Sequence, residues 1–142
     1  MKKAIALLSF AFLLISCLKD DSESFSPSYI NFEYEGVEIQ TDTLALPLNQ
    51  AHYITVTAQS RISSKPKYFK KMDGQEWIDI TDTSETMIKS QVYGSGYREI
   101  RDIVINLTDS AYIHLESLQY SVTLMDREQG QMRRTIHIRT ED

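Results

Sequence analysis

The stretch YSVTLMDREQGQMRRTIHIR, residues 120–139, carries the pattern that decides the fold. In its first part, apolar Tyr120, Val122 and Leu124 alternate with polar residues, and the same alternation resumes over residues 132–139. A period of two is typical of a β-strand with one buried face. The polar connection at residues 126–130 suits a tight reversal, so the stretch predicts two antiparallel strands joined as a hairpin.

The same strand-like character recurs through most of the chain. Further runs cover residues 29–34, 37–39, 53–58, 68–72, 75–80, 88–93 and 97–107. The glycine-containing segments 73–74 and 94–96 each separate two of these runs, and both are typical of hairpin turns. Within the longest run we expect Ile103, Ile105 and Leu107 to face inward.

Only residues 109–117 favour a short helix, with Asp109 as its N-cap. Each predicted strand has one apolar face to bury, and two sheets packed face to face meet that need. We therefore predict an all-β protein, an antiparallel β-sandwich of about seven to nine strands with at most one short helix.

A segment before the penultimate strand adds a family resemblance. Asp109 and the run Leu118-Gln119-Tyr120-Ser121-Val122 resemble the corner of immunoglobulin-like folds in which a tyrosine enters the core beside a turn. The chain has a single cysteine, which excludes antibody-type domains. Over about residues 44–140 the chain is similar to the immunoglobulin-like and fibronectin-like modules of Bacteroidetes surface lipoproteins, which implies an immunoglobulin-like sandwich.

The N-terminus has the features of a secretion signal. Lys2 and Lys3 precede an apolar run over residues 4–15. As a helix this run would span about 20 Å, which is less than the bilayer core of about 30 Å. We therefore predict a cleaved signal peptide at residues 1–16 and no permanent membrane span.

Leu14-Ile15-Ser16-Cys17 closely resembles the lipobox of bacterial lipoproteins. That family implies lipidation of Cys17, cleavage before it and acylation of the new amine, and several acyl chains anchor a protein stably. Lys19, Asp20 and Asp21 resemble the Bacteroidetes lipoprotein export signal, which implies display on the outer face of the outer membrane. A lipoprotein of the same membrane that faces the periplasm is the alternative.

Composition limits the classes of partner. Loss of Lys2 and Lys3 with the signal leaves 13 basic against 20 acidic side chains, a net charge of −7. An acidic chain is a poor candidate for binding nucleic acid. Residues 17–28 are polar and acidic and are predicted to form a flexible tether to one domain at residues 29–142.

Aromatic residues beside the predicted turns are the candidates for ligand binding. Trp77, Tyr93 and Tyr97 can stack on the apolar face of a sugar if they are exposed. For Trp77 the alternative is a place in the core. For Tyr93 and Tyr97, which flank the 94–96 turn, we expect exposed cross-strand partners.

Basic residues form two clusters against the acidic background. The first contains Arg61 and the candidate basic patch Lys65, Lys67, Lys70 and Lys71, and the second contains Arg133, Arg134 and Arg139. Both can meet an acidic glycan, a lipopolysaccharide or a partner protein. The alternative is a solvated face that discourages edge pairing.

Catalytic and metal-binding patterns are absent from the sequence. His52, His114 and His137 have no spacing typical of metal ligands. Carboxylates such as Asp79 and Asp82 follow no recognisable pattern in a chain so rich in acids, and no nucleophile motif is present. We predict no enzyme activity, no cofactor and no metal. Asp42-Thr43-Leu44 and Asp109-Ser110-Ala111 resemble the Bacteroidetes O-glycosylation pattern, which implies Thr43 and Ser110 as candidate acceptors.

These observations favour a non-catalytic surface lipoprotein that binds a glycan or another ligand, or that assists a nutrient-uptake or adhesion system. The first alternative is a structural or inhibitory subunit of an outer-membrane assembly, and a small hydrolase is the second. The expected partners are the membrane, through the lipid anchor, and a glycan or an outer-membrane protein.

Overall fold

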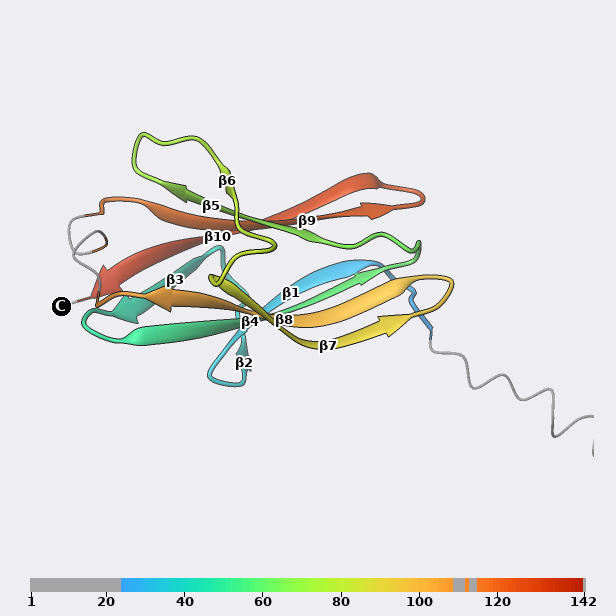
Figure 1. Ribbon diagram of the computed structural model, residues 1–142, viewed down its shortest axis with the longest axis horizontal. Helices are drawn as coiled ribbons and strands as arrows, with labels where there is room; N and C mark the ends of the chain where they lie inside the picture. Colours follow the sequence, from blue (N-terminus) through green and yellow to red (C-terminus); the bar gives the residue numbers. More distant parts are fainter. Residues whose placement is uncertain (1–23, 109–111, 113–114, 142) are drawn as a thin grey trace, which may run out of the picture.

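The computed structural model describes residues 24–108, 112 and 115–141, and it arranges them in two layers of strands (Figure 1). The strands are β1 (Tyr29–Tyr34), β2 (Val37–Glu38), β3 (Thr43–Pro47), β4 (Ala51–Ser60), β5 (Lys67–Met72), β6 (Ile78–Asp79), β7 (Thr86–Tyr93), β8 (Tyr97–Asn106), β9 (Leu118–Asp126) and β10 (Gly130–Glu141). Sheet A has the order β2-β1-β4-β8-β7, and sheet B has the order β3-β10-β9-β5-β6. The prediction of an all-β protein is confirmed, and the two layers are consistent with a β-sandwich.

Two predicted hairpins are present. In β9 and β10, Asp126 lies opposite Gly130 around a polar connection. In β7 and β8, Tyr93 lies opposite Tyr97 around the 94–96 turn. All pairings are antiparallel except the one between β3 and β10.

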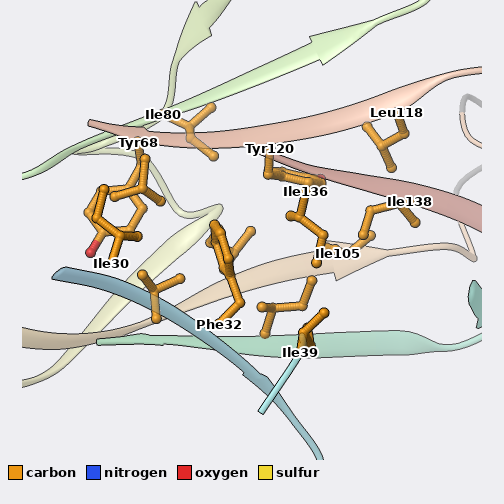
Figure 2. Packing of buried hydrophobic residues seen from close by; sticks show 14 of the residues in the cluster. Ile30, Phe32, Ile39, Tyr68, Ile80, Ile105, Leu118, Tyr120, Ile136 and Ile138 are labelled. Atoms are coloured by element: carbon orange, nitrogen blue, oxygen red, sulfur yellow. The ribbon is translucent and has the colours of Figure 1, made fainter. Parts of the chain in front are cut away.

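The core lies between the sheets and uses alternate residues of the long strands. Figure 2 shows Phe32 and Ile105 of sheet A facing Tyr120 and Ile136 of sheet B. The inward-facing residues of β8 that we predicted, Ile103 and Ile105, are completely buried, as is Leu107 just beyond the strand. Burial of these side chains is the main stabilising contribution, at about 1.5–3 kcal/mol for each large apolar side chain.

Several details differ from the prediction. The described residues contain ten strands rather than seven to nine, because β3 pairs in parallel with β10, about ninety residues later in the sequence. β3 ends in Pro47. Because proline within sheets is confined mainly to edge strands, its presence argues against a strand in the sequence pattern, and β3 was not predicted. The predicted strand at residues 75–80 is reduced to the two-residue β6, so residues 73–77 form a loop rather than a tight two-residue turn.

The predicted helix at residues 109–117 lies largely outside the described residues. Within it, Tyr112 is helical and residues 115–117 are not. Tyr120 enters the core as expected, but its buried hydroxyl has no hydrogen-bond partner in the described part of the chain.

Packing against the domain begins before β1. Phe25 is only 7% exposed and lies against Gly94 and Gly96, where a Cβ atom would collide with its ring. Gln59 donates a hydrogen bond to the carbonyl oxygen of Pro27 at 2.7 Å. Contacts with the sheets therefore start within the segment predicted to be a tether.

The predicted signal peptide, Cys17 and the export motif Lys19, Asp20 and Asp21 lie outside the described residues. In the described part of the chain, no helix is long and apolar enough to cross a membrane.

Candidate ligand-binding face

The outer face of sheet B brings together parts of both basic clusters. Tyr68 and Lys70 of β5 are buried toward sheet A, so Lys67 and Lys71 point outward. On β10, Ile136 and Ile138 are buried, so Arg133 and Arg139 also point outward. Strand β9 lies between β5 and β10, which places the two basic rows about 10 Å apart.

Trp77 is positioned above this face by the loop between β5 and β6. The loop projects from sheet B on the side away from sheet A (Figure 1). It turns at Gly74, whose φ of +63° suits glycine, and Gln75 donates a hydrogen bond to the Met72 carbonyl at 3.0 Å. Ile80, which is completely buried, fixes the far end of the loop.

The indole of Trp77 lies between cations of two different strands. The Nζ of Lys71 is 5.8 Å from the ring centroid, and the Cζ of Arg133 is 5.4 Å from it. Since Lys71 belongs to β5 and Arg133 to β10, the ring extends over β9. Trp77 is half-buried and lies outside the core cluster, so the core alternative for this residue is wrong.

The middle strand of the face offers neutral polar groups. Ser121 and Thr123 point outward from β9, yet both are at most 5% exposed. Thr135 of β10 donates a hydrogen bond to the Ser121 hydroxyl at 3.1 Å. In the register of the sheet, Thr123 lies between Lys67 and Arg133, so hydroxyl groups separate the basic rows.

Carboxylates also lie on or beside this face: Asp79 of β6, and Asp42 and Glu116 in a hollow next to Arg139. Asp79 of β6 accepts a hydrogen bond from the backbone N–H of Thr81 at 2.9 Å. Hydrogen bonds from Thr81 lower the pKa of Asp79, and the charge of Lys67 lowers it further. Lys67 is therefore partly compensated, and Lys71, Arg133 and Arg139 are the cations most available to a ligand.

Lys70 is not part of the surface patch, which corrects the prediction. Its side chain is 9% exposed, and its Nζ lies 2.5 Å from a carboxylate oxygen of Glu85. Burial lowers the pKa of Lys70, but hydrogen bonds to Glu85 and to the Tyr112 hydroxyl outweigh it and leave the pKa raised. Side chains of β5 point alternately to the two faces of sheet B, and this places Lys70 on the inner face. The run of neighbouring lysines in the sequence did not indicate this direction.

Tyr93 and Tyr97 have different environments, although their rings meet edge to face at a centroid distance of 5.0 Å. Tyr93 is 57% exposed, and Lys65 lies over its ring at 5.8 Å. Tyr97 is 1% exposed, so the prediction that it is exposed is wrong. Its hydroxyl donates to Glu99 at 2.6 Å, and burial together with this carboxylate raises its pKa.

Of the second basic cluster, Arg134 has a structural role. It points inward and donates hydrogen bonds to the carbonyl oxygens of Ile30 at 3.1 Å and Ile39 at 2.7 Å. Its guanidinium lies 5.1 Å from the ring centroid of Phe32. Arg133, its neighbour in sequence, points outward to Trp77. Their opposite directions follow from the two-residue period of a strand.

The histidines remain separate. His52 is buried, and its two ring nitrogens contact the Tyr34 hydroxyl at 2.8 Å and the Pro47 carbonyl at 2.7 Å. His137 is exposed on β10, and His114 lies outside the described residues. Among residues the structure describes, no group of three His, Cys, Asp or Glu side chains is placed to hold a metal ion.

Of the two glycosylation candidates, Thr43 is exposed at the start of β3, and Ser110 lies outside the described residues. Thr43 contributes to a hollow of about 470 Å³ on sheet B, together with Glu116, His137 and Arg139. The hollow is continuous with the Arg139 end of the face, because Arg139 belongs to both.

Comparison with known proteins returns no matching family model and no relative among curated proteins. Function must therefore be argued from the described face itself.

Proposed function

We propose that the chain is a non-catalytic lipoprotein of the cell envelope whose outer face of sheet B binds a glycan. One observation carries the binding part of the proposal: the loop between β5 and β6 holds Trp77 on the outside of a rigid sheet, flanked by Lys71 and Arg133. An aromatic ring on a rigid face has little conformational entropy to lose on binding.

The test is retention of the purified protein in affinity gels that contain soluble polysaccharides. We expect Trp77→Ala to lose most of the retention that the wild type has. Tyr53→Ala is the matched control, since Tyr53 is a 52% exposed aromatic residue on the outer face of sheet A. No retention by any polysaccharide, or equal losses in both variants, contradicts glycan binding at this face.

The anchoring part of the proposal rests on the sequence signals at residues 1–21. Replacement of Cys17 by Ser should release the protein from membranes, because no acyl chain would attach. Replacement of Lys19, Asp20 and Asp21 by alanine should protect the protein from protease added to intact cells. Unchanged protease access in this variant would contradict a role of Lys19, Asp20 and Asp21 in export. Protection of the wild type itself would favour the periplasm-facing alternative.

We also propose that the sandwich is immunoglobulin-like. In chain order, β1, β4, β7 and β8 take the places of strands A, B, D and E, since sheet A runs β1-β4-β8-β7. In sheet B the order β10-β9-β5 then corresponds to strands G, F and C. An experimental structure with β1 paired to β8 instead of β4 would contradict this assignment.

The second candidate function is that of an interaction subunit, and the free edge of sheet A favours it. β7 forms this edge over eight residues, with Met87 49% and Ile88 45% exposed. Long exposed edges are templates for pairing with another chain. Crosslinking of membranes from producing cells should then capture a partner that Ile88→Lys loses. Crosslinks unaffected by that change would contradict a role for this edge.

A further inference from the structure

We infer that the outer face of sheet B binds an acidic polysaccharide, one whose sugars carry carboxylate groups, rather than a neutral one. The inference rests on the proposed glycan-binding function and names its ligand class. It rests on four cations of this face that form no ion pair among the described residues, although Asp79 partly compensates the charge of Lys67.

Several cations away from this face are already paired with carboxylates, Lys70 with Glu85 among them. Arg61 binds Asp126, Lys89 lies 3.1 Å from Asp102, and Arg101 lies 3.1 Å from Glu99. By contrast, no carboxylate of the described residues lies within ion-pair distance of the four outward-facing cations of sheet B. These four are Lys67, Lys71, Arg133 and Arg139.

The four cations form two rows along β5 and β10, which run in the same direction on either side of β9. Lys67 and Lys71 are about 13 Å apart along β5, and Arg133 and Arg139 are about 20 Å apart along β10, at the usual rise of a strand. The Trp77 ring lies over β9 between the rows, and the β9 hydroxyls beneath are at most 5% exposed. An extended chain with spaced negative charges would therefore contact the cations along the rows on either side of this ring.

Trp77 favours an anionic ligand over a neutral one. Its ring already has Lys71 and Arg133 within cation–π distance, so a neutral sugar would have to displace a cation in order to stack. A carboxylate at the edge of the ring would instead meet both cations. Charge-assisted hydrogen bonds of this kind are about twice as strong as neutral ones.

A nucleic acid fits this face less well. Its charge is dense, about one negative charge per 1.7 Å of duplex, whereas the chain has a net charge of −5. Asp73 and Glu76 also lie exposed in the same loop as Trp77 and would repel such a ligand. A sparsely charged polysaccharide can place its carboxylates at the cations and avoid these acids.

The experiment compares two polymers with the same backbone, carboxymethyl cellulose and hydroxyethyl cellulose, in affinity gels at low salt. We expect retention by the carboxylated polymer only. It should weaken steeply as salt is raised from 0.02 to about 0.2 M, because screening shortens the Debye length to below about 10 Å. The double variant K71Q/R133Q should lower affinity about tenfold or more, which corresponds to about 1.4 kcal/mol.

The matched control is K65Q/R127Q, which also removes two exposed charges. Lys65 lies over the Tyr93 ring rather than beside Trp77, and Arg127 lies in the turn between β9 and β10. It should bind as the wild type does. Equal losses in both double variants would show non-specific attraction and overturn the inference.

Other outcomes separate the inference from the proposed function. Equal retention by the two polymers, abolished in Trp77→Ala, would overturn the acidic ligand and keep glycan binding. Retention by neither polymer overturns the inference, whereas glycan binding itself fails only if no polysaccharide retains the protein. Tighter binding of single-stranded oligo-dT than of carboxymethyl cellulose in the same gels would assign the face to nucleic acid and overturn the inference.

Discussion

At the scale of single residues, the most constrained group is the Glu99 side chain. It is completely buried between the sheets and accepts hydrogen bonds from Tyr68 at 2.8 Å and Tyr97 at 2.6 Å. Arg101 compensates its charge and lies 4.7 Å above the Tyr68 ring. A buried charge is tolerated only when such partners surround it.

Glu99→Gln should lower the free energy of unfolding by about 3 kcal/mol, because the Arg101 guanidinium then stays buried without its anion. Urea denaturation measures this change. Glu128→Gln is the control, since that side chain is 74% exposed in its pair with Arg61, and it should cost less than about 0.5 kcal/mol. Equal stability of Glu99→Gln and wild type would contradict a stabilising contact between Glu99 and Arg101.

Asp126 should make stability depend on acid pH. Hydrogen bonds from Arg61, from the Ser28 hydroxyl and from the backbone at residues 128–129 hold its pKa well below the usual range. The unfolded carboxyl has a pKa of about 3.9. Its contribution is therefore fully present above pH 5 and is lost progressively as the pH falls below about 4 toward the folded-state pKa.

Asp126→Asn should therefore be less stable than wild type at pH 7, and the difference should shrink between pH 4 and 2. Urea midpoints measured across this range test the prediction. Asp82→Asn, a change at an exposed position, serves as control for general charge effects. If the urea midpoints of Asp126→Asn and wild type differ by the same amount at every pH, Asp126 is not the source of the pH dependence.

At the scale of elements, the turn between β7 and β8 reverses the chain and also provides the surface against which Phe25 packs. Gly96 is buried, and a Cβ atom there would overlap the Ser60 carbonyl oxygen and the side chain of Phe25. The absence of a side chain thus lets the segment before β1 pack against the hairpin.

Gly96→Ala should destabilise the protein by about 1–3 kcal/mol, as expected for overpacking against backbone. Ser95→Ala, at the exposed centre of the same turn, should be nearly neutral. Thermal unfolding of both variants makes the comparison. If both variants have the melting temperature of the wild type, the Phe25 side chain does not pack against this turn.

At the scale of the whole molecule, polar contacts join the sheets on both flanks of the core. Arg134 of β10 bonds to the Ile30 and Ile39 carbonyl oxygens, and Tyr68 of β5 bonds to Glu99 of β8. The outer face of sheet B, with Trp77, is therefore supported by a sandwich whose layers cannot slide easily.

Arg134→Ala should cost about 2 kcal/mol, because carbonyl oxygens next to the core lose their donor. Arg133→Ala, one residue away on the opposite face, should change stability by less than about 0.5 kcal/mol and should weaken polysaccharide retention. Urea denaturation and affinity gels on the same two proteins test both parts. The reverse pattern would mean that the strand has the opposite register.

Much of this architecture follows from local pattern. The period of two over residues 120–139 predicted β9 and β10, and the glycine turn at 94–96 predicted the β7–β8 hairpin, because alternation and turn chemistry act between near neighbours. The inward direction of Ile103 and Ile105 followed from the same rule. The signals at residues 1–21 are local as well, and they stay predictions.

Only the tertiary structure decided which residues meet on the candidate face. Lys71 and Arg133 are 62 positions apart, and Trp77 reaches both because β9 pairs with β5 and β10 at once. Pairing between distant strands depends on packing of the whole core, so β3 and the parallel pairing were missed. For the same reason, basic residues that are neighbours in the sequence lie on opposite faces of sheet B. Lys70 and Arg134 point toward the interior, whereas Lys71 and Arg133 point outward and can contact a ligand.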